Sequence, residues 1–298
     1  MAARRGPTYL RVVLGNELKT LREQKRRQAE QDGEDAASWT AEAVSARLGF
    51  SRSKLSRVEA GEIPLPKVKD LIALLDEFGV TGDHERDDLK QLQLDSLKVD
   101  PITAYRAFLP SGMLRYLGLE LASVRIRGYE NNVVHGLLQH EAYAAALMGS
   151  AKIVEERTTE AVERSIQARM ERKNLLVDSD RKVHIILTEN TLRTCVGGPD
   201  VMRQQYAELT RLCGLDNVDV QVIPQDLPAY RAGFNFTLLE FEALGPVAQS
   251  DGYRSITMWS KPADVGQFAR QFEAMATAAP GPSETPRILK DLEEELWT

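Results

Sequence analysis

The sequence has little cysteine and no long hydrophobic run. Only Cys195 and Cys213 are present, and neither has the neighbouring ligands of a zinc site. Two thiols in a chain of 298 residues are typical of a reducing compartment. No window approaches the roughly 18–20 consecutive apolar residues of a membrane span, and the first residues lack the apolar core of a secretory signal. We therefore expect a cytoplasmic protein of about two domains, at roughly 150 residues each.

The chain also lacks the net basic charge of many nucleic-acid-binding proteins. Its 38 Lys+Arg and 44 Asp+Glu give a net charge of −6. The charge is unevenly distributed, however. Residues 1–61 hold 12 basic and 8 acidic residues, a net charge of +4, which leaves 26 and 36 in the remainder, a net charge of −10. This asymmetry is typical of a small basic domain joined to an acidic one.

Common catalytic motifs are missing as well. The chain contains neither GxSxG nor GxxxxGK[ST]. His135 and His140 are five positions apart, so they would not share a helical face as the two histidines of HExxH do. The sequence predicts no metal site, no cofactor and no enzymatic activity.

The spacing of apolar residues predicts an α+β chain, with an N-terminal all-α five-helix domain and a larger mixed α+β domain. We expect the first domain over residues 1–82, a helical linker over 83–112 and the second domain over 113–298. Helices are predicted over residues 9–27, 40–48, 51–60, 67–78, 83–97, 114–122, 141–148, 154–176, 199–213, 263–276 and 286–297. Strands are predicted over residues 124–129, 182–187, 218–223 and 235–241.

Residues 40–61 carry the most informative pattern, TAEAVSARLGFSRSKLSRVEAG. It predicts two short helices joined by a tight glycine turn, the spacing that lets the second helix of a helix-turn-helix lie in the DNA major groove. That helix, residues 51–60, would expose short hydroxyl and long basic side chains, which suit base edges and phosphates. The alternative is a helical hairpin with a solvated basic face. We expect Glu59 to pair with Arg22 or Arg47 inside the domain.

Residues 18–23 and 40–61 resemble the XRE (phage-repressor-like) helix-turn-helix family. The resemblance implies a five-helix, lambda-repressor-like domain whose third helix contacts the major groove. Two features depart from the family: Ala41 stands where glutamine is usual, and a longer segment separates Glu23 from the second helix. The predicted DNA-binding residues are Thr40, Ser51, Arg52, Ser53, Lys54, Ser56 and Arg57, with Arg4 and Arg5 in an N-terminal arm.

The second domain resembles the C-terminal domain of actinomycete WhiJ-like regulators, which are antitoxin-like and often encoded beside a small partner protein. The matching segments are residues 129–147, 164–176, 189–198, 220–224 and 233–241. In two departures, His135 replaces a usual proline and residues 247–252 lack a usual aromatic–acid pair. The candidate ligand- or partner-binding residues are Gln139, Tyr143, Arg169, Arg172, Glu189 and Arg193. For the arginines, the alternative is a salt-bridged surface.

The sequence thus predicts a sequence-specific DNA-binding transcriptional regulator whose second domain senses a small partner protein or ligand. A homodimer would place two copies of the second motif helix in successive major grooves, about 34 Å apart. The alternative is an antitoxin-like interaction protein that neutralises a small partner encoded nearby, with DNA binding as autoregulation. No membrane partner is expected.

Overall fold

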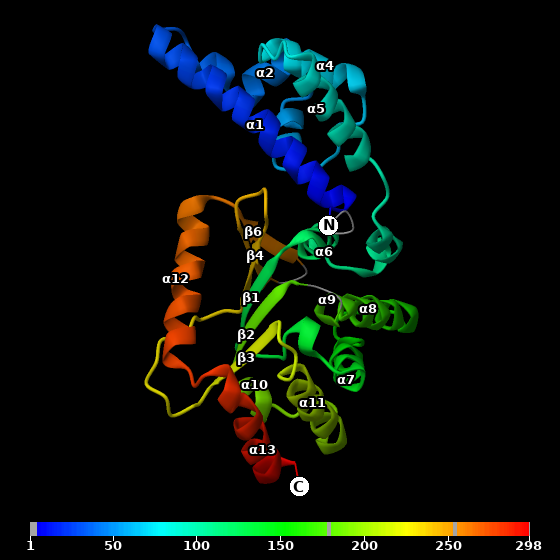
Figure 1. The fold of residues 1–298 in the computed structure, drawn as a ribbon. Coiled ribbons are helices and arrows are strands. Elements are labelled where there is room, and N and C mark those ends of the chain that lie inside the picture. Colours follow the sequence, from blue (N-terminus) through cyan, green and yellow to red (C-terminus); the bar gives the residue numbers. More distant parts are fainter. Residues whose placement is uncertain (1–4, 178–179, 253–254, 298) are drawn as a thin grey trace. The chain divides into compact units, whose positions relative to one another are not determined.

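The computed structural model describes residues 5–177, 180–252 and 255–297 (Figure 1). The chain divides into two compact units, Met1–Pro101 and Ile102–Thr298. Helices make up the first unit, and the second contains a six-stranded sheet together with helices. The predicted α+β class, a helical domain followed by a mixed domain, is confirmed.

The first unit contains five α-helices among its described residues. They are α1 (Pro7–Asp32), α2 (Ala41–Arg47), α3 (Lys54–Glu59), α4 (Val68–Glu77) and α5 (Asp83–Ser96), with the 3₁₀ helix η2 (Ala36–Trp39) after α1. The inward faces of α1, α3 and α4 carry apolar residues at helical spacing. Together these faces bury one core that includes Leu14, Leu18, Val44, Leu55, Val58, Leu71, Leu74 and Leu75.

Glycine allows α1 to approach α3 closely. A Cβ on Gly15 would lie 2.3 Å from the carbonyl oxygen of Val58. Gly61, which follows α3, has φ +66°, and a Cβ there would lie 2.7 Å from Cγ2 of Val12. Only a residue without a side chain fits at these two points, so the position of α3 against α1 is fixed by contacts of the backbone.

α5 belongs to the first unit. Its Leu89 lies in the same apolar core, and Gln93 donates from Nε2 to a backbone carbonyl before α4 at 2.6 Å. Further along, the Asp100 carboxylate accepts a hydrogen bond from the backbone nitrogen of Thr8 at 3.0 Å. The helical linker expected over residues 83–112 is therefore divided, because its first half packs on α1 and α4.

The second unit is built on a mixed sheet with the strand order β3-β2-β1-β4-β5-β6. The strands are β1 (Arg125–Glu130), β2 (Lys182–Thr188), β3 (Val218–Ile223), β4 (Phe236–Glu240), β5 (Val247–Gly252) and β6 (Ser255–Trp259). β1, β2 and β3 are parallel, and the remaining pairings are antiparallel. Parallel neighbours require crossover connections, which the helices between β1 and β3 supply.

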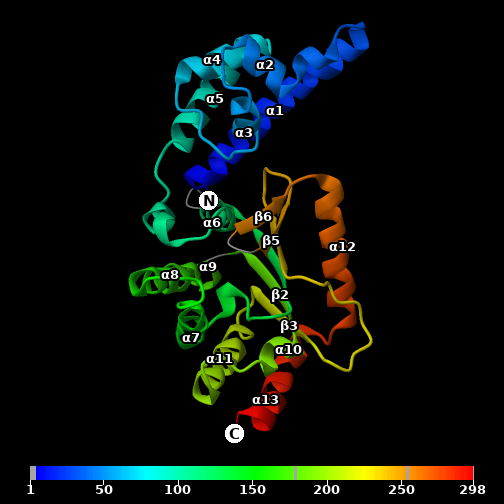
Figure 2. The same ribbon diagram turned by 180° about the vertical axis from the view of Figure 1, so that it is seen from behind.

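Helices cover both faces of this sheet. The helices from residue 101 onward are α6 (Met113–Ala122), α7 (Glu141–Ala151), α8 (Thr159–Arg172), α9 (Asn174–Val177), α10 (Glu189–Arg193), α11 (Pro199–Leu212), α12 (Pro262–Ala278) and α13 (Thr285–Leu296), with the 3₁₀ helices η3 (Pro101–Phe108), η4 (Gly136–Leu138) and η5 (Pro282–Glu284). α12 lies on one face, and α7, α8 and α11 lie on the other (Figures 1 and 2). Among the described residues, no helix has both the length and the apolar character to span a bilayer.

Two of the differences from the prediction concern residues 154–176 and residues 247–259. The helix predicted over residues 154–176 is interrupted, because Glu156 has a φ of +54° and Thr158 caps a new helix by accepting a hydrogen bond from the backbone nitrogen of Ala161 at 3.1 Å. Strands β5 and β6 are absent from the prediction, because residues 247–259 carry little apolar alternation. Their pairing with β4 and with each other holds them in the sheet.

Candidate nucleic-acid interface and second-domain cavity

α2 and α3 form the helix-turn-helix of the first unit. Thr40 caps α2 as predicted, with Oγ1 accepting a hydrogen bond from the backbone nitrogen of Ala43 at 3.2 Å. α3 begins at Lys54 rather than at Ser51, because the preceding residues form a turn in which the Ser51 carbonyl accepts from the Lys54 nitrogen at 2.9 Å. The second motif helix is therefore shorter than predicted, and Ser51 lies before it.

The outward side of the turn and of α3 carries most of the predicted DNA-binding residues. Ser51, Arg52, Ser53, Ser56 and Arg57 are all exposed. The side chain of Arg57 is 53% exposed and lies 3.5 Å from the Glu62 carboxylate. An exposed guanidinium in such a weak pair can turn to a phosphate or to a guanine edge.

Lys54 differs from its neighbours. Its Nζ donates to the Asp70 carboxylate at 2.6 Å and lies 3.8 Å from the ring centroid of Phe50. The side chain is 23% exposed. The sequence predicts that Lys54 contacts DNA, but its charge is balanced within the domain, where it joins the start of α3 to the start of α4.

The inner side of α3 is held by a buried ion pair. Glu59 accepts from Nε of Arg22 at 2.6 Å and from the Nη2 nitrogen of the same guanidinium at 2.8 Å, and Arg22 also donates to the Trp39 carbonyl at 2.9 Å. Burial alone lowers the pKa of Arg22, but the hydrogen bond and charge of Glu59 outweigh it and raise that pKa. Of the two predicted partners of Glu59, Arg22 is the one observed, whereas Arg47 pairs with Glu77 at 2.7 Å.

Two further basic residues, Lys67 and Lys69, are exposed at the start of α4. They precede Asp70, whose carboxylate contacts Lys54 at the start of α3. A helix N-terminus together with lysine favours phosphate. Both lysines are missing from the predicted interface, although the pattern Pro-Lys-Val-Lys at a helix start is a usable signal. Arg5 is exposed, and Arg4 lies outside the described residues.

In the second unit, the six predicted residues form two separate groups. The first group surrounds η4 and α8. Gln139 is buried, donating from Nε2 to the Val134 carbonyl at 2.7 Å and accepting from Arg169 at 2.7 Å. The hydroxyl of Tyr143, also buried, accepts from the Val134 nitrogen at 3.3 Å. Gln139 and Tyr143 therefore act as internal supports, and only Arg169 and Arg172 among the four face a cavity.

Arg172 is balanced by a buried carboxylate. Its guanidinium donates to both oxygens of Glu120 at 2.8 and 2.7 Å, and the hydroxyl of Tyr116 donates to the same carboxylate at 2.7 Å. Burial alone raises the pKa of Glu120, but the charge and hydrogen bonds of Arg172 outweigh it and lower that pKa. This ion pair fixes α8 against α6.

His135, beside this ion pair, is a buried structural residue. Its Nδ1 accepts from the Leu137 nitrogen at 3.3 Å, and its Nε2 lies 3.4 Å from Oγ1 of Thr237. Burial lowers the pKa of His135 to about 4, against the opposing charge of Glu120. Among the described residues, no three His, Cys, Asp or Glu side chains are grouped to hold a metal ion.

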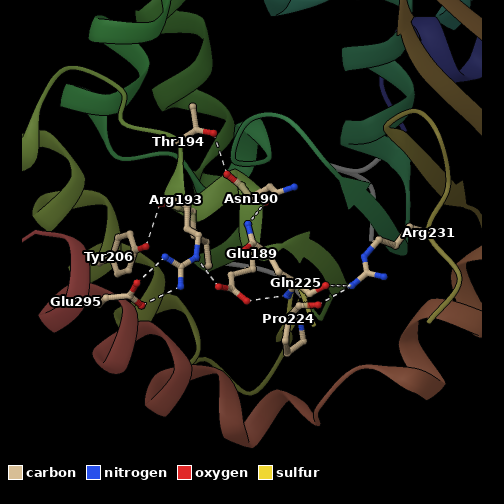
Figure 3. A network of polar contacts seen from close by, with 10 residues as sticks. Glu189, Asn190, Arg193, Thr194, Tyr206, Pro224, Gln225, Arg231 and Glu295 are labelled. Atoms are coloured by element: carbon tan, nitrogen blue, oxygen red, sulfur yellow. Dashed lines mark hydrogen bonds and ion pairs between the residues drawn. The ribbon is translucent and has the colours of Figure 1, made fainter. Parts of the chain in front are cut away.

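The second group lies around α10, next to the ends of β2 and β3 (Figure 3). Glu189 accepts from Nε of Arg193 at 2.5 Å and from the Gln225 nitrogen at 2.8 Å. Arg193 also donates to both oxygens of Glu295 at 2.8 Å. Arg231, opposite, donates to the Pro224 carbonyl at 2.6 Å. Glu189 and Arg193 thus tie α10 to α13 and to the end of β3.

Two family models match the chain. One, described as a helix-turn-helix domain, matches residues 13–89, and the other, described as a domain of unknown function (DUF5753), matches residues 113–291. The first match begins in α1 and ends in α5, and it indicates DNA binding with a regulatory role. Neither a curated protein nor a solved structure matches the chain.

Proposed function

The chain belongs to the DUF5753 family and carries a helix-turn-helix domain before the family domain, and we propose that it is a sequence-specific transcriptional regulator. The observation that carries this proposal is the division of α3 into two sides. Its outward side holds Ser56 and Arg57 in the open, whereas Glu59 on its inner side is bound by Arg22. A helix held so firmly from behind can present its outer side chains to DNA without rearranging.

In this proposal a homodimer places two copies of α3 in successive major grooves, about 34 Å apart. Arg52 and Arg57 bind phosphates or guanine edges, and the neighbouring serines set the register. Lys67 and Lys69 add phosphate contacts from the start of α4, and Arg5 reaches the adjacent minor groove. Lys54 contributes by fixing α3 to α4.

The second domain, in this proposal, is an effector domain that binds a small ligand or a small partner protein and catalyses no reaction. Its cavity and the charged side chains around it support this role. Occupation of the domain would alter the dimer or its availability for DNA, since an effector shifts an equilibrium only by binding two states differently.

Fluorescence anisotropy with the DNA upstream of the chain's own gene tests the DNA-binding role. We expect selective binding with a steep salt slope. The R52A/R57A variant should bind at least about thirtyfold more weakly, because each arginine contact to a guanine edge is worth about 1–3 kcal/mol. Its salt slope should fall by about one for each phosphate that the variant no longer neutralises.

The matched control is K90A/K98A, which removes two positive charges from the same unit at residues paired with Asp87 and Asp95. This variant should retain the affinity and the salt slope of the parent. Equal decreases in affinity for both double variants would show that only the total charge matters and would contradict the proposed interface. Binding that ignores DNA sequence would contradict sequence-specific regulation.

A further inference from the structure

We propose that the cavity lined by α6, α7 and α8 and by the segments that flank them binds a small organic monoanion, a carboxylate carried on a short apolar body. This inference rests on the effector role proposed above for the second domain and names the chemistry of the ligand. Three properties of the cavity carry it: its walls, the state of its arginines and its charge balance.

The walls of the cavity are mostly apolar. Its volume is about 280 Å³, and its lining includes Met113 and Leu117 of α6 and Leu147 and Met148 of α7. Ala168 adds a small side chain from α8. Ligand sites typically have this character, an apolar lining with a few placed polar groups, and volumes from about 300 Å³ upward. At about 280 Å³ the cavity lies just below this range, so its size suits a small molecule rather than a protein segment.

Arg169 supplies the polar end. One guanidinium nitrogen donates to the Gln139 side-chain oxygen at 2.7 Å, and among the described residues no carboxylate lies within ion-pair distance of it. Arg172, one helical turn away on the same wall, has both arms on Glu120. Since a carboxylate accepts two parallel hydrogen bonds from a guanidinium, the unused face of Arg169 is a ready partner for a bound anion.

The remaining charges at the cavity compensate one another. Arg157 lies 3.9 Å from the Glu155 carboxylate and donates to Oγ of Ser165 at 2.5 Å. Arg172 is balanced by Glu120. One positive charge, that of Arg169, is left over. A carboxylate cancels it, whereas a phosphate monoester carries about −1.5 to −2 charges and would leave negative charge in an apolar space.

The titration of Arg169 agrees with this charge balance. Burial, followed by the charge of Arg172, lowers the pKa of Arg169 to about 10, while the charges of Asp251, Glu130 and Glu120 oppose that shift. The guanidinium stays charged at neutral pH, in surroundings that disfavour its charge. A bound carboxylate would remove this penalty, so ligand binding should raise that pKa again.

Calorimetric titration of the full chain with octanoate and with octanamide tests the inference, because the two differ in charge but hardly in size. We expect octanoate to bind at least tenfold more tightly, since hydrogen bonds to charged groups exceed about 1.4 kcal/mol. The variant R169Q should lose at least tenfold of octanoate affinity and bind the two compounds alike. R164Q, which removes an exposed charge from the same helix outside the cavity, should bind as the parent does.

A second variant, A168L, fills the cavity and leaves every charge in place, so it carries the test if R169Q fails to fold. It should bind octanoate at least tenfold more weakly, with an unchanged fold by circular dichroism. No octanoate binding to the parent chain would overturn the inference. Equal affinity for octanoate and octanamide, or octanoate binding unaffected by A168L, would also overturn it.

Anisotropy with and without octanoate separates this inference from the proposed function. Octanoate binding that changes DNA affinity supports both. Octanoate binding that leaves DNA affinity unchanged supports the cavity and contradicts the effector role. Selective DNA binding by a chain that ignores octanoate supports the regulator and contradicts the cavity ligand.

Discussion

Each unit has one arginine held in a buried ion pair and a second arginine that can bind a ligand. The units differ in where this second arginine lies. In the first unit, Arg22 is buried and fully paired with Glu59, and the exposed Arg57 faces outward. In the second unit, Arg172 is paired with Glu120, and the neighbouring Arg169 lines a cavity with mostly apolar walls.

This difference indicates what each unit is suited to bind. A buried, hydrogen-bonded ion pair fixes the scaffold in both units, and a nearby arginine that is weakly paired or unpaired with a carboxylate supplies the charge left for a ligand. Where that charge lies on an open helix, it suits an extended polyanion such as DNA. Where it lies at the wall of a small apolar cavity, it suits one small anion.

Removing the carboxylate of either buried ion pair should have the largest effect on stability. We expect Glu120→Ala to destabilise the second unit by about 3–5 kcal/mol, because it leaves Arg172 buried without a counter-charge. Glu59→Ala should destabilise the first unit through Arg22 for the same reason. Hydrogen exchange of the full chain, read for each unit, measures both effects.

The exposed Arg193–Glu295 pair supplies the control for that experiment. Glu295 is 54% exposed, so Glu295→Ala should leave exchange in the sheet almost unchanged. If Glu120→Ala and Glu295→Ala had similar effects, the buried pair would not be what holds α8 to α6.

The pH dependence of stability should also separate the units. The pKa of His135 is depressed to about 4 from an ordinary 6.5, so the unfolded chain binds this proton more readily. The depressed pKa of His135 contributes about 3 kcal/mol to the free energy of unfolding above about pH 6.5, and this contribution is lost as the pH falls towards 4. In His135→Gln, unfolding of the second unit should depend less on pH over this range.

Two features make that measurement specific. Burial, followed by the charge of Asp251, raises the pKa of Glu130 well above its ordinary value. This shift changes stability with pH in the opposite direction, because a raised pKa in the folded state makes stability fall as the pH rises. It is common to the parent and the His135 variant, so the difference between their profiles isolates His135. His84, which is 92% exposed in the first unit, supplies the control His84→Gln. Parallel profiles for the parent and His135→Gln would rule out the depressed pKa.

Much of the fold follows from local sequence patterns. The apolar spacing of α1 and α4 and the β-branched runs of β1–β3 are local signals, and these elements lie at their predicted places. β5 and β6 have no comparable signal, because their order comes from pairing with β4 rather than from their own side chains. The break before α8 depends on a threonine cap inside an otherwise helical pattern.

The candidate sites depend more on distant contacts. Thr40 and the exposed side of α3 could be predicted, because helix capping and periodicity act over a few residues. The balancing of Lys54 by Asp70 could not, since 16 positions separate them. The sequence also could not predict that Arg172 pairs with a carboxylate and Arg169 does not, because Glu120 comes from another helix, 52 positions away from Arg172.

A smaller loss of stability is expected where the backbones of α1 and α3 meet in the first unit. Gly15→Ala would bring a Cβ to 2.3 Å from the Val58 carbonyl oxygen, so α1 must move away from α3. We expect a destabilisation of about 1–3 kcal/mol, as for other overpacked contacts, and weaker DNA binding because α3 shifts with it. Urea unfolding and anisotropy measure the two effects. Unchanged stability would show that the helices can separate without cost.

The smallest expected effect is the matching substitution in the second unit. Gly149 lies in α7, and a Cβ there would meet nothing within 4 Å. Gly149→Ala should therefore stabilise the second unit by about 0.5–1 kcal/mol, because alanine loses less backbone entropy than glycine when a helix forms. The midpoint temperature of thermal unfolding should rise by roughly 1–4 °C for a unit of this size. Opposite signs for the two glycine substitutions are expected, because only at Gly15 does the backbone of another helix occupy the space. If Gly149→Ala also destabilised the protein, the end of α7 would need the conformational freedom of glycine, and the contrast between the two helices would fail.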